Sequence, residues 1–421
     1  MNFKALFILV FICNVCFSQI VSEQKTEIIK TNNGFQLLRN GNPYYVNGAG
    51  GTEYLDVLKS IGGNSIRTWS TGDAKKVLDD AYDNGISVCL GLWVGHERHG
   101  FDYNDEYAVT AQLKAFEQDI LKYKDHPALL MWAVGNEVDL FYKNFRVWDA
   151  IEDIAKMIKE IDPNHPTMTV TAGIDPAEVF MIKTYCPSID ILGVNTYGGI
   201  QHLSDAVRMY GWDKPYMVTE WGPYGHWESP MTTWGVAVEA TSKEKANFRE
   251  IAYKSISKDV DLCLGSYAFL WGHKQEQTPT WYGLFTKEGN ATQSIDVLNS
   301  CWGNNHRNRA PILHSFLLNN KDKKESVKIK RGKDCVFTYE VTDPDNDSLK
   351  YEFQLMPEST DKKSGGDFEK TPEPISFTVV ENLDDKLIIK GPLKSGPYRF
   401  FIYVRDSNKN VATANIPFYV K

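Results

Sequence analysis

Apolar runs of strand length alternate with stretches of helical periodicity along most of this chain, from about residue 41 to residue 303. The apolar runs are nearly continuous, as in strands buried on both faces, and they end near residues 47, 69, 94, 137, 171, 197, 220 and 271. Apolar side chains recur at helical spacing in residues 74–83, 111–123, 145–161 and 243–257. Eight alternations predict an α/β fold, a (β/α)8 TIM barrel, over residues 41–303.

Other patterns flank the predicted barrel. Residues 19–40 are a lead-in that is polar to residue 33 and β-like from Phe35 to Leu38. The polar residues 304–311 predict a linker. Residues 312–421 contain short β runs between turn-forming clusters, which predicts a small all-β sandwich of the immunoglobulin or cadherin type. Within it, the charged stretch 357–374 is predicted to be a mobile loop.

The first 18 residues have the composition of a secretory signal peptide. Lys4 precedes an apolar stretch from Ala5 to Val15, and small side chains follow at the expected cleavage site. This stretch is shorter than the roughly 20 residues that span a bilayer, and no transmembrane segment is predicted elsewhere. The sequence therefore predicts a secreted or periplasmic protein, which could be associated with the cell surface.

Charge and cysteine content exclude several classes of protein. The chain has 54 acidic and 46 basic residues and a net charge of −8, without the clustered basic residues that bind nucleic acid. The cysteines after residue 18 fit neither a disulfide framework nor a zinc site. No G-x-G-x-x-G motif follows an early strand, which disfavours a dinucleotide cofactor.

The run LLMWAVGNEVD, from Leu129 to Asp139, is the most informative stretch of the chain. It is an apolar strand that ends abruptly on Asn136 and Glu137. An ionised carboxylate at such a position is costly unless a partner or a polar ligand receives it, so this ending indicates function. A second apolar run places Glu220 at a strand end in the same way.

The carboxyl-terminal ends of the strands form the active-site face of a TIM barrel. Amides, carboxylates, an arginine and aromatic side chains gather at the predicted ends, as in a sugar-binding site where aromatic rings stack on pyranose faces and polar groups bind hydroxyls. The candidate site residues are Arg67, Trp69, His96, Asn136, Glu137, Asn195, Tyr197, Glu220, Trp221 and Trp271.

Two carboxylates on opposite walls of one site are the machinery of glycoside hydrolysis. One protonates the departing oxygen, and the other attacks the anomeric carbon or activates water. The predicted fourth and seventh strands lie across the barrel mouth, which fits the spacing of about 5–5.5 Å in retaining enzymes.

The stretch from about Asn42 to Trp302 resembles the catalytic barrels of clan A retaining glycoside hydrolases. The run from His126 through Trp132 to Glu137 is most similar to glycoside hydrolase family 2. Family 2 enzymes usually carry a jelly roll and a β-sandwich before the barrel, and neither is expected ahead of residue 41. Shorter motifs also resemble the β-1,3-glucan-active families of the same clan, so a β-glucan is the favoured substrate.

The resemblance also implies individual roles. Glu137 corresponds to the general acid/base, Asn136 to a contact with the sugar 2-hydroxyl, and Glu220 to the nucleophile. Arg67 corresponds to the arginine that orients the nucleophile and Tyr197 to the tyrosine beside it. The strand-eight aromatic that lies under the sugar corresponds to Trp271.

Other interpretations remain open at this stage. A transglycosylase would use the same glutamates, and a non-catalytic glycan-binding protein could have the same barrel. His96 and His99 are three residues apart, whereas a zincin helix needs histidines four apart, so no metal is predicted there. The acidic residues 343–347 do not fit an EF-hand, although another calcium geometry or a solvated turn is possible. No cofactor is expected, and a carbohydrate is the expected partner.

Overall fold

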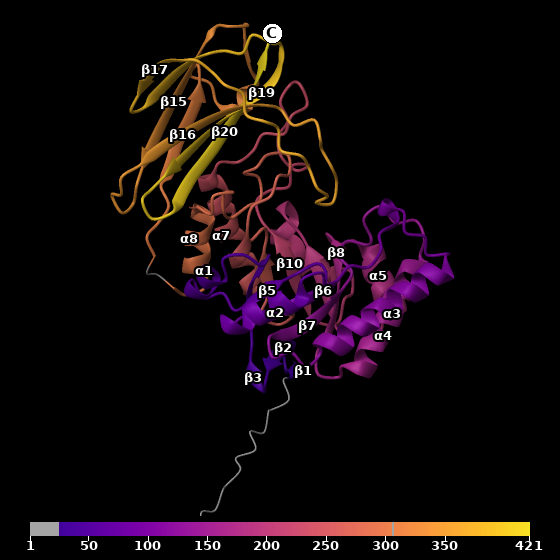
Figure 1. Cartoon of the computed structure of the whole chain (residues 1–421). Coiled ribbons are helices and arrows are strands. Elements are labelled where there is room, and N and C mark those ends of the chain that lie inside the picture. The colour runs from indigo at the N-terminus through magenta and orange to yellow at the C-terminus, as the bar shows by residue number, and fades with distance from the viewer. Residues whose placement is uncertain (1–24, 305–306) are drawn as a thin grey trace, which may run out of the picture.

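The structure is a computed structural model that describes residues 25–304 and 307–421. The predicted signal peptide, residues 1–18, therefore lies outside the described residues. Two bodies are visible in Figure 1, a barrel surrounded by helices and a β-sandwich packed against one end of it. Among the described residues, no helix is both long and apolar enough to cross a membrane.

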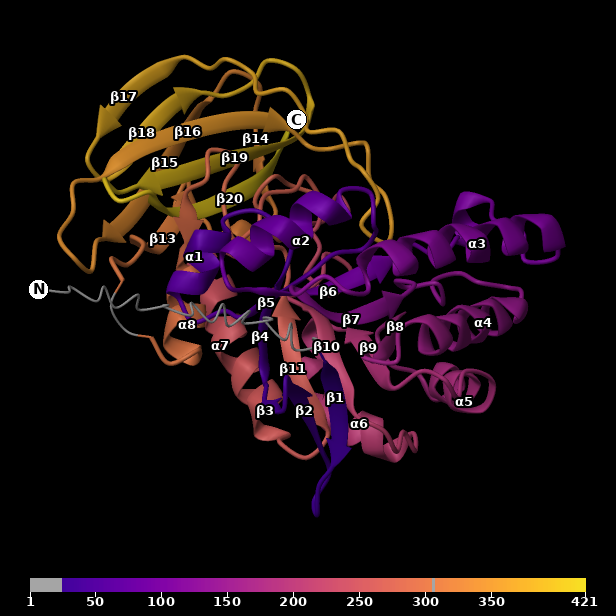
Figure 2. The same cartoon turned by 60° about the horizontal axis from the view of Figure 1, so that its bottom comes forward.

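Eight parallel strands close into a barrel in the order β10-β11-β4-β5-β6-β7-β8-β9, which confirms the predicted fold class. The strands are β4 (Val46–Gly50), β5 (Ser65–Arg67), β6 (Ser87–Leu92), β7 (Leu129–Val134), β8 (Thr167–Ala172), β9 (Ile191–Asn195), β10 (Tyr216–Trp221) and β11 (Cys263–Ala268). Figure 2 shows the helices on the outside of this barrel. Each strand ends within three residues of its predicted position: β5, β6, β7, β9 and β11 end earlier, and β4, β8 and β10 end later.

The helices are α1 (Leu55–Ser60), α2 (Ala74–Asp83), α3 (Glu106–Tyr123), α4 (Arg146–Ile161), α5 (Pro176–Tyr185), α6 (Leu203–Met209), α7 (Ser242–Lys258) and α8 (Gln293–Cys301), with 3-10 turns η1 (Glu97–His99), η2 (Gly198–His202) and η3 (Lys323–Glu325). The predicted helices coincide with α2, α4 and α7 to within one residue. Helix α3 begins five residues before its predicted start because the Asp105 carboxylate caps it, accepting hydrogen bonds from the amides of Tyr107 and Ala108.

A three-stranded antiparallel sheet closes the amino-terminal end of the barrel. It consists of β1 (Thr26–Lys30), β2 (Phe35–Arg39) and β3 (Asn42–Pro43). Asn40 and Gly41 both have positive φ, as a tight hairpin turn requires. Leu37 is buried against the apolar side chains that fill the barrel interior. Strand β1 was not predicted, since its stretch is polar, but its pairing with β2 gives it strand structure.

Two sheets form the sandwich, in the orders β12-β20-β19-β16 and β13-β15-β18-β17, with β14 paired to β20. The strands are β12 (Ala291–Thr292), β13 (Ile312–Leu318), β14 (Val327–Ile329), β15 (Asp334–Thr342), β16 (Lys350–Pro357), β17 (Val379–Leu383), β18 (Lys386–Lys390), β19 (Gly396–Arg405) and β20 (Asn410–Val420). Phe337 and Phe400 stack between the sheets with ring centroids 4.0 Å apart. An additional all-β domain was predicted and is present.

The sandwich is joined to the barrel by more than the linker. Strand β12 precedes α8 in the barrel yet pairs in parallel with β20 of the sandwich. Glu239, which is 2% exposed, accepts hydrogen bonds from Lys245 and Thr278 of the barrel domain and from Asn415 of the sandwich. Arg399 of the sandwich donates to the carbonyl oxygen of Ala237 at 2.9 Å. These contacts fix one domain on the other.

We expect the buried Glu239 carboxylate to contribute strongly to the stability of the whole chain. Burial opposes its charge, but Lys245 and Arg399 lower its pKa below the ordinary value. The substitution Glu239→Ala leaves the Lys245 ammonium buried without its carboxylate partner. The free energy of unfolding should fall by about 3–5 kcal/mol in chemical denaturation.

A matched control is Glu288→Ala, which removes the 3.3 Å ion pair between Arg405 and a glutamate whose side chain is 56% exposed. It should change the free energy of unfolding by less than about 0.5 kcal/mol. Equal effects of the two substitutions would contradict a dominant role for the buried carboxylate.

Candidate active site

The two predicted catalytic glutamates lie at the carboxyl-terminal face of the barrel. Glu220 is the next-to-last residue of β10 and is 6% exposed, whereas Glu137 follows β7 and is half-buried. The chain turns sharply after β7, with φ of 79° at Gly135 and 51° at Glu137. A positive φ is uncommon for glutamate and costs backbone energy, which is typical of functional positions.

The Glu220 carboxylate is held by three donors. Its Oε1 atom accepts from Arg67 Nη1 at 2.9 Å and from Trp69 Nε1 at 2.7 Å. Its Oε2 atom accepts from the Tyr197 hydroxyl at 3.0 Å. Hydrogen bonds to both oxygens, one of them from a buried guanidinium, stabilise the ionised form and fix its orientation.

Amide side chains connect the two glutamates. Arg67 Nη2 donates to Asn136 Oδ1 at 2.6 Å, so one guanidinium bridges Asn136 and Glu220. Asn195 Nδ2 donates to both Asn136 Oδ1 at 3.1 Å and Glu137 Oε1 at 2.8 Å. The Asn195 amide is oriented in turn by the Thr219 hydroxyl, which donates to its Oδ1 atom at 2.8 Å. One hydrogen-bonded chain therefore positions both carboxylates.

The environment separates the protonation states of the pair. Burial and, secondly, the charge of Glu220 raise the pKa of Glu137 from 4.5 to about 7. A carboxyl group with this pKa is substantially protonated near neutral pH and can donate a proton. Asp139, two residues further on, also has its pKa raised to about 7 by burial and by the charge of Glu137.

His96, Trp221 and Trp271 do not occupy the ligand-contact positions predicted for them. His96 is 1% exposed, and its Nε2 atom donates to the backbone oxygen of Asn136 at 2.6 Å. It therefore holds the Asn136 backbone in place. Burial lowers the pKa of His96 and favours the neutral ring. Side chains alternate along β10, so Trp221 faces away from the mouth because its neighbour Glu220 faces into it. The Trp221 ring packs towards Tyr253 of α7.

The strand-eight aromatic at the site is Phe269, not Trp271. Trp271 is 1% exposed, donates its indole N–H to the Glu53 carbonyl oxygen at 2.7 Å and packs on Phe285. Phe269 instead lies edge-on to both Trp69 and Tyr197, with ring centroids 6.0 and 6.2 Å apart. Phe269 was not predicted from the sequence, because the role was assigned to Trp271, an aromatic residue two positions later.

Further residues of the mouth come from the loop after β11. Trp281 and Tyr282 join the aromatic cluster around Phe269. Glu276 is 6% exposed and forms an ion pair with Lys274 at 2.8 Å. Burial raises the pKa of Glu276, and the charge of Glu220 acts in the same direction. These residues were not predicted from the sequence. The loop after β11 has no helical or strand periodicity from which inward-facing side chains could be identified.

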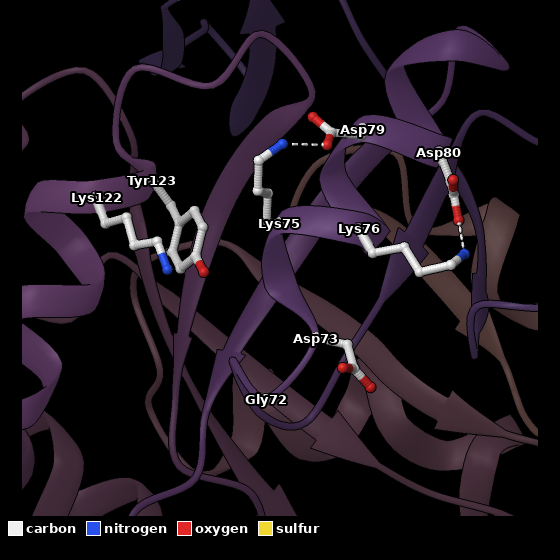
Figure 3. Close-up of a pocket in the computed structure, with 8 residues that line it drawn as sticks. All are labelled: Gly72, Asp73, Lys75, Lys76, Asp79, Asp80, Lys122 and Tyr123. Carbon is white, nitrogen blue, oxygen red and sulfur yellow. Dashed lines mark hydrogen bonds and ion pairs between the residues drawn. The ribbon is translucent and has the colours of Figure 1, made fainter.

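Pockets elsewhere on the chain do not contain this chemistry. A pocket of about 410 Å³ lies on the outer surface between α2 and α3, and Figure 3 shows the residues that line it. Four of its charged side chains form two ion pairs, Lys75 with Asp79 at 2.6 Å and Lys76 with Asp80. A second pocket, of about 720 Å³, lies beside α5. Neither is lined by Glu137 or Glu220.

In the sandwich, carboxylate oxygens of Asp343, Asp347 and Asp406 lie within 4.8 Å of one another. Asn308 and Asn408 donate hydrogen bonds to Asp347 at 2.6 and 3.0 Å. The expectation of no metal or cofactor stays a prediction.

Two carboxylates joined by one hydrogen-bonded network at the mouth of a (β/α)8 barrel are the arrangement typical of glycoside hydrolase-like barrels. Comparison with known proteins refines this class. Residues 53–227 match the model of the TIM barrel domain of glycosyl hydrolases family 2. The predicted resemblance to a family 2-like, clan A glycoside hydrolase is therefore confirmed.

The relatives found are β-glucuronidases. That of Paenibacillus borealis is 23% identical over 312 residues, covering 64% of this chain and 51% of the relative. That of Felis catus is 25% identical over 221 residues, covering 44% of this chain and 32% of the relative. The chain thus matches between about a third and a half of the length of these relatives.

Solved structures share the fold. The Bifidobacterium dentium β-glucuronidase has a TM-score of 0.52 at 17% identity, covering 66% of this chain and 49% of that one. An FMN-binding β-glucuronidase from Faecalibacterium prausnitzii also has a TM-score of 0.52, at 14% identity, and covers 94% of this chain and 59% of that one. The second match extends beyond the barrel into the sandwich.

The raised pKa of Glu137 predicts how stability depends on pH. Between about pH 4.5 and 7 the folded protein retains a proton that the unfolded chain has lost, so stability falls as the pH rises through this window. The substitution Glu137→Gln keeps the Oε1 acceptor and removes the buried charge. The Tm of this variant should exceed that of the wild type by a few degrees at pH 8 and equal it at pH 4.5.

Thermal denaturation at both pH values measures this difference, with Glu160→Gln on the exposed face of α4 as the control. An identical Tm offset at pH 4.5 and pH 8 would refute a cost from charging Glu137.

Proposed function

We propose that this protein is a β-glycosidase that acts by double displacement, with Glu220 as nucleophile and Glu137 as general acid/base. The observation that carries the proposal is the asymmetry of the pair. The Glu220 carboxylate accepts hydrogen bonds from Arg67, Trp69 and Tyr197, whereas Glu137 beside it has its pKa raised to about 7.

In the first step, a Glu220 carboxylate oxygen bonds to the anomeric carbon while the bond to the leaving oxygen breaks. Glu137 gives its proton to that oxygen, and the aglycone departs. Glycosylation neutralises Glu220, which removes a charge that kept the pKa of Glu137 high. Glu137 can then take a proton from water, which attacks the anomeric carbon and releases Glu220 with its original charge.

Asn136 is suited to bind the sugar. Because a guanidinium can only donate, the contact with Arg67 holds Asn136 Oδ1 towards the arginine and leaves the amide nitrogen to meet a hydroxyl. The half-buried Trp69 and Tyr197 rings, together with Phe269, supply apolar surface for a pyranose face.

The charge of the site favours a neutral sugar, and we propose a β-glucan or gluco-oligosaccharide as the substrate. A uronic acid would need a free cation. Three cationic side chains near the pair are matched by a carboxylate, Arg67 by Glu220 at 2.9 Å, Arg98 by Asp367 at 3.1 Å and Lys274 by Glu276 at 2.8 Å. The buried Arg249 instead donates to the carbonyl oxygens of Trp221, Phe269 and Tyr282. An added carboxylate would meet a mouth that is already acidic.

The second candidate is a β-glucuronide, because the relatives found are β-glucuronidases. It requires Lys274 or Arg98 to exchange its present carboxylate partner for that of the substrate. The two candidates differ in one substrate group, so a direct comparison distinguishes them.

We also propose export from the cytoplasm, on the basis of residues 1–18, which lie outside the described structure. Amino-terminal sequencing of the protein recovered from periplasm or medium tests this. A chain that still begins at Met1 in the cytoplasm would contradict it.

The decisive test of the reaction is hydrolysis of aryl β-glucosides, aryl β-glucuronides and β-1,3-, β-1,4- and β-1,6-glucans by wild type and variants. We expect Glu137→Ala to lower kcat/KM by about 10²–10⁴-fold on glycosides with poor leaving groups and far less with a dinitrophenyl leaving group, which needs no proton in the first step. Glu220→Ala should lower kcat by about 10⁴-fold or more, and azide should restore turnover with an α-glycosyl azide product.

Glu160→Ala, on the exposed face of α4, serves as a matched control and should behave as the wild type. Wild-type kcat/KM should decline above about pH 7 as Glu137 loses its proton. Activity that survives Glu220→Ala without azide would disprove the nucleophile assignment, and preference for the glucuronide would overturn the neutral-sugar proposal.

A further inference from the structure

A loop of the sandwich, residues 358–374, reaches the mouth of the barrel. It connects β16 with β17, and Figures 1 and 2 both show this amber segment leaving the sandwich and extending to the barrel. A mobile loop was predicted for residues 357–374. The described residues instead form specific contacts with two barrel loops, one after β6 and one after β11.

On the side of the acid/base residue, the loop contacts the segment after β6. Asp367 accepts hydrogen bonds from Arg98 at 3.1 Å and from His99 at 3.0 Å. Arg98, whose side chain is only 9% exposed, also donates to the Ser364 carbonyl oxygen at 3.1 Å. The His99 ring lies 5.2 Å from His96, the residue that supports Asn136.

On the side of the nucleophile, the loop contacts the segment after β11. Glu369 is 1% exposed, and its carboxylate accepts from the Gln277 amide at 2.6 Å and the Lys363 amide at 2.9 Å. Lys274, the ion-pair partner of Glu276, donates to the Gly366 carbonyl oxygen at 2.6 Å. The loop therefore bridges the two sides of the barrel mouth through buried or paired charges.

The loop also lies close to the aromatic wall above Glu220. The Glu369 charge acts on His226, whose ring packs edge-on against Trp227 at 4.9 Å. The Trp227 ring packs edge-on against Tyr197 at 5.6 Å, and Tyr197 donates to Glu220. Two aromatic residues thus separate this loop from a residue that holds the proposed nucleophile.

Phe368 stands between the two anchored carboxylates of Asp367 and Glu369, and its side chain is 83% exposed. The flanking contacts fix the backbone and keep a large apolar ring in water. Two other exposed aromatic residues border the same mouth, Trp93 at 40% and Trp227 at 59%. Trp93 is linked to the loop through His99, whose ring stacks on it with an angle of 14°.

We propose that the 358–374 loop is a wall of the substrate cleft and that Phe368 is a platform for a sugar unit outside the cleaved bond. The ligand is a neutral β-linked oligosaccharide longer than the unit held between Glu137 and Glu220. The sandwich thereby contributes directly to specificity for chain length. This inference rests on the proposed glycosidase function and extends it to the substrate's size.

If the loop served only to hold the two domains together, Asp367 and Glu369 would be sufficient, and the exposed Phe368 ring between them would contribute nothing. A sugar platform needs that ring, because an aromatic face stacks on the C–H groups of a pyranose. The two roles therefore differ in their dependence on Phe368.

The test compares Phe368→Ala and Phe368→Trp with Phe180→Ala, which removes a 62% exposed phenylalanine from α5. KM and kcat are measured on gluco-oligosaccharides of two to six units and on an aryl β-glucoside. Phe368→Ala should raise KM by about 5- to 10-fold for the longest oligosaccharides, with a much smaller change for the aryl glucoside. Phe368→Trp, which keeps an aromatic ring, should have a KM close to that of the wild type. Phe180→Ala should leave KM and kcat unchanged.

Binding separates failure of this inference from failure of the proposed function. The same oligosaccharides are titrated calorimetrically into Glu220→Ala with and without Phe368→Ala. A loss of affinity that depends on Phe368 supports the cleft wall even if the wild type hydrolyses none of the panel. Equal affinities, or equal effects on short and long substrates, would overturn the inference while leaving the two-glutamate reaction intact.

Discussion

One buried guanidinium organises the mouth of the barrel. Arg67 is 1% exposed and contacts the Glu220 carboxylate, the Asn136 amide and the Thr219 carbonyl oxygen. A guanidinium removed from water is stabilised by a charged partner and directed acceptors, and Glu220, Asn136 and Thr219 supply them. The ionised Glu220 then helps to keep its neighbour Glu137 protonated. The different surroundings of the two glutamates thus follow in part from burying one positive charge between three strand ends.

The sandwich shares this dependence on buried charge. Glu239 is surrounded by donors from both domains, and Glu369 brings a buried carboxylate from the sandwich to the Gln277 amide of the barrel. Such groups are costly unless every contact forms, so they favour a single arrangement of the two domains. A loop held in this arrangement can present Phe368 at a fixed position relative to the glutamates.

The mouth combines a few polar contacts with a larger aromatic surface. Glu137, Asn136 and Asn195 form the polar floor, and Trp69, Tyr197 and Phe269 provide rings around it. This division suits a ligand with hydroxyls at its edge and C–H groups on its face. The pocket between α2 and α3 has no such division, since it is lined mainly by charged side chains.

The sequence by itself determined the barrel and the position of its two glutamates. Strand and helix periods differ, so the alternation was readable along the chain, and a carboxylate that ends an apolar strand is conspicuous in any barrel. Side-chain alternation next to Glu220 also implied that Trp221 faces outward, although that implication was missed.

Only the tertiary structure decided the contacts that no local pattern encodes. It placed Trp271 against Phe285 and Phe269 beside Trp69. These contacts could not be predicted, because the loop after β11 has no regular periodicity. The tertiary structure also brought residues 358–374 to Arg98, more than 250 positions away in the sequence. Contacts of this kind depend on how two completed domains pack together, and this packing leaves no periodic trace in the sequence.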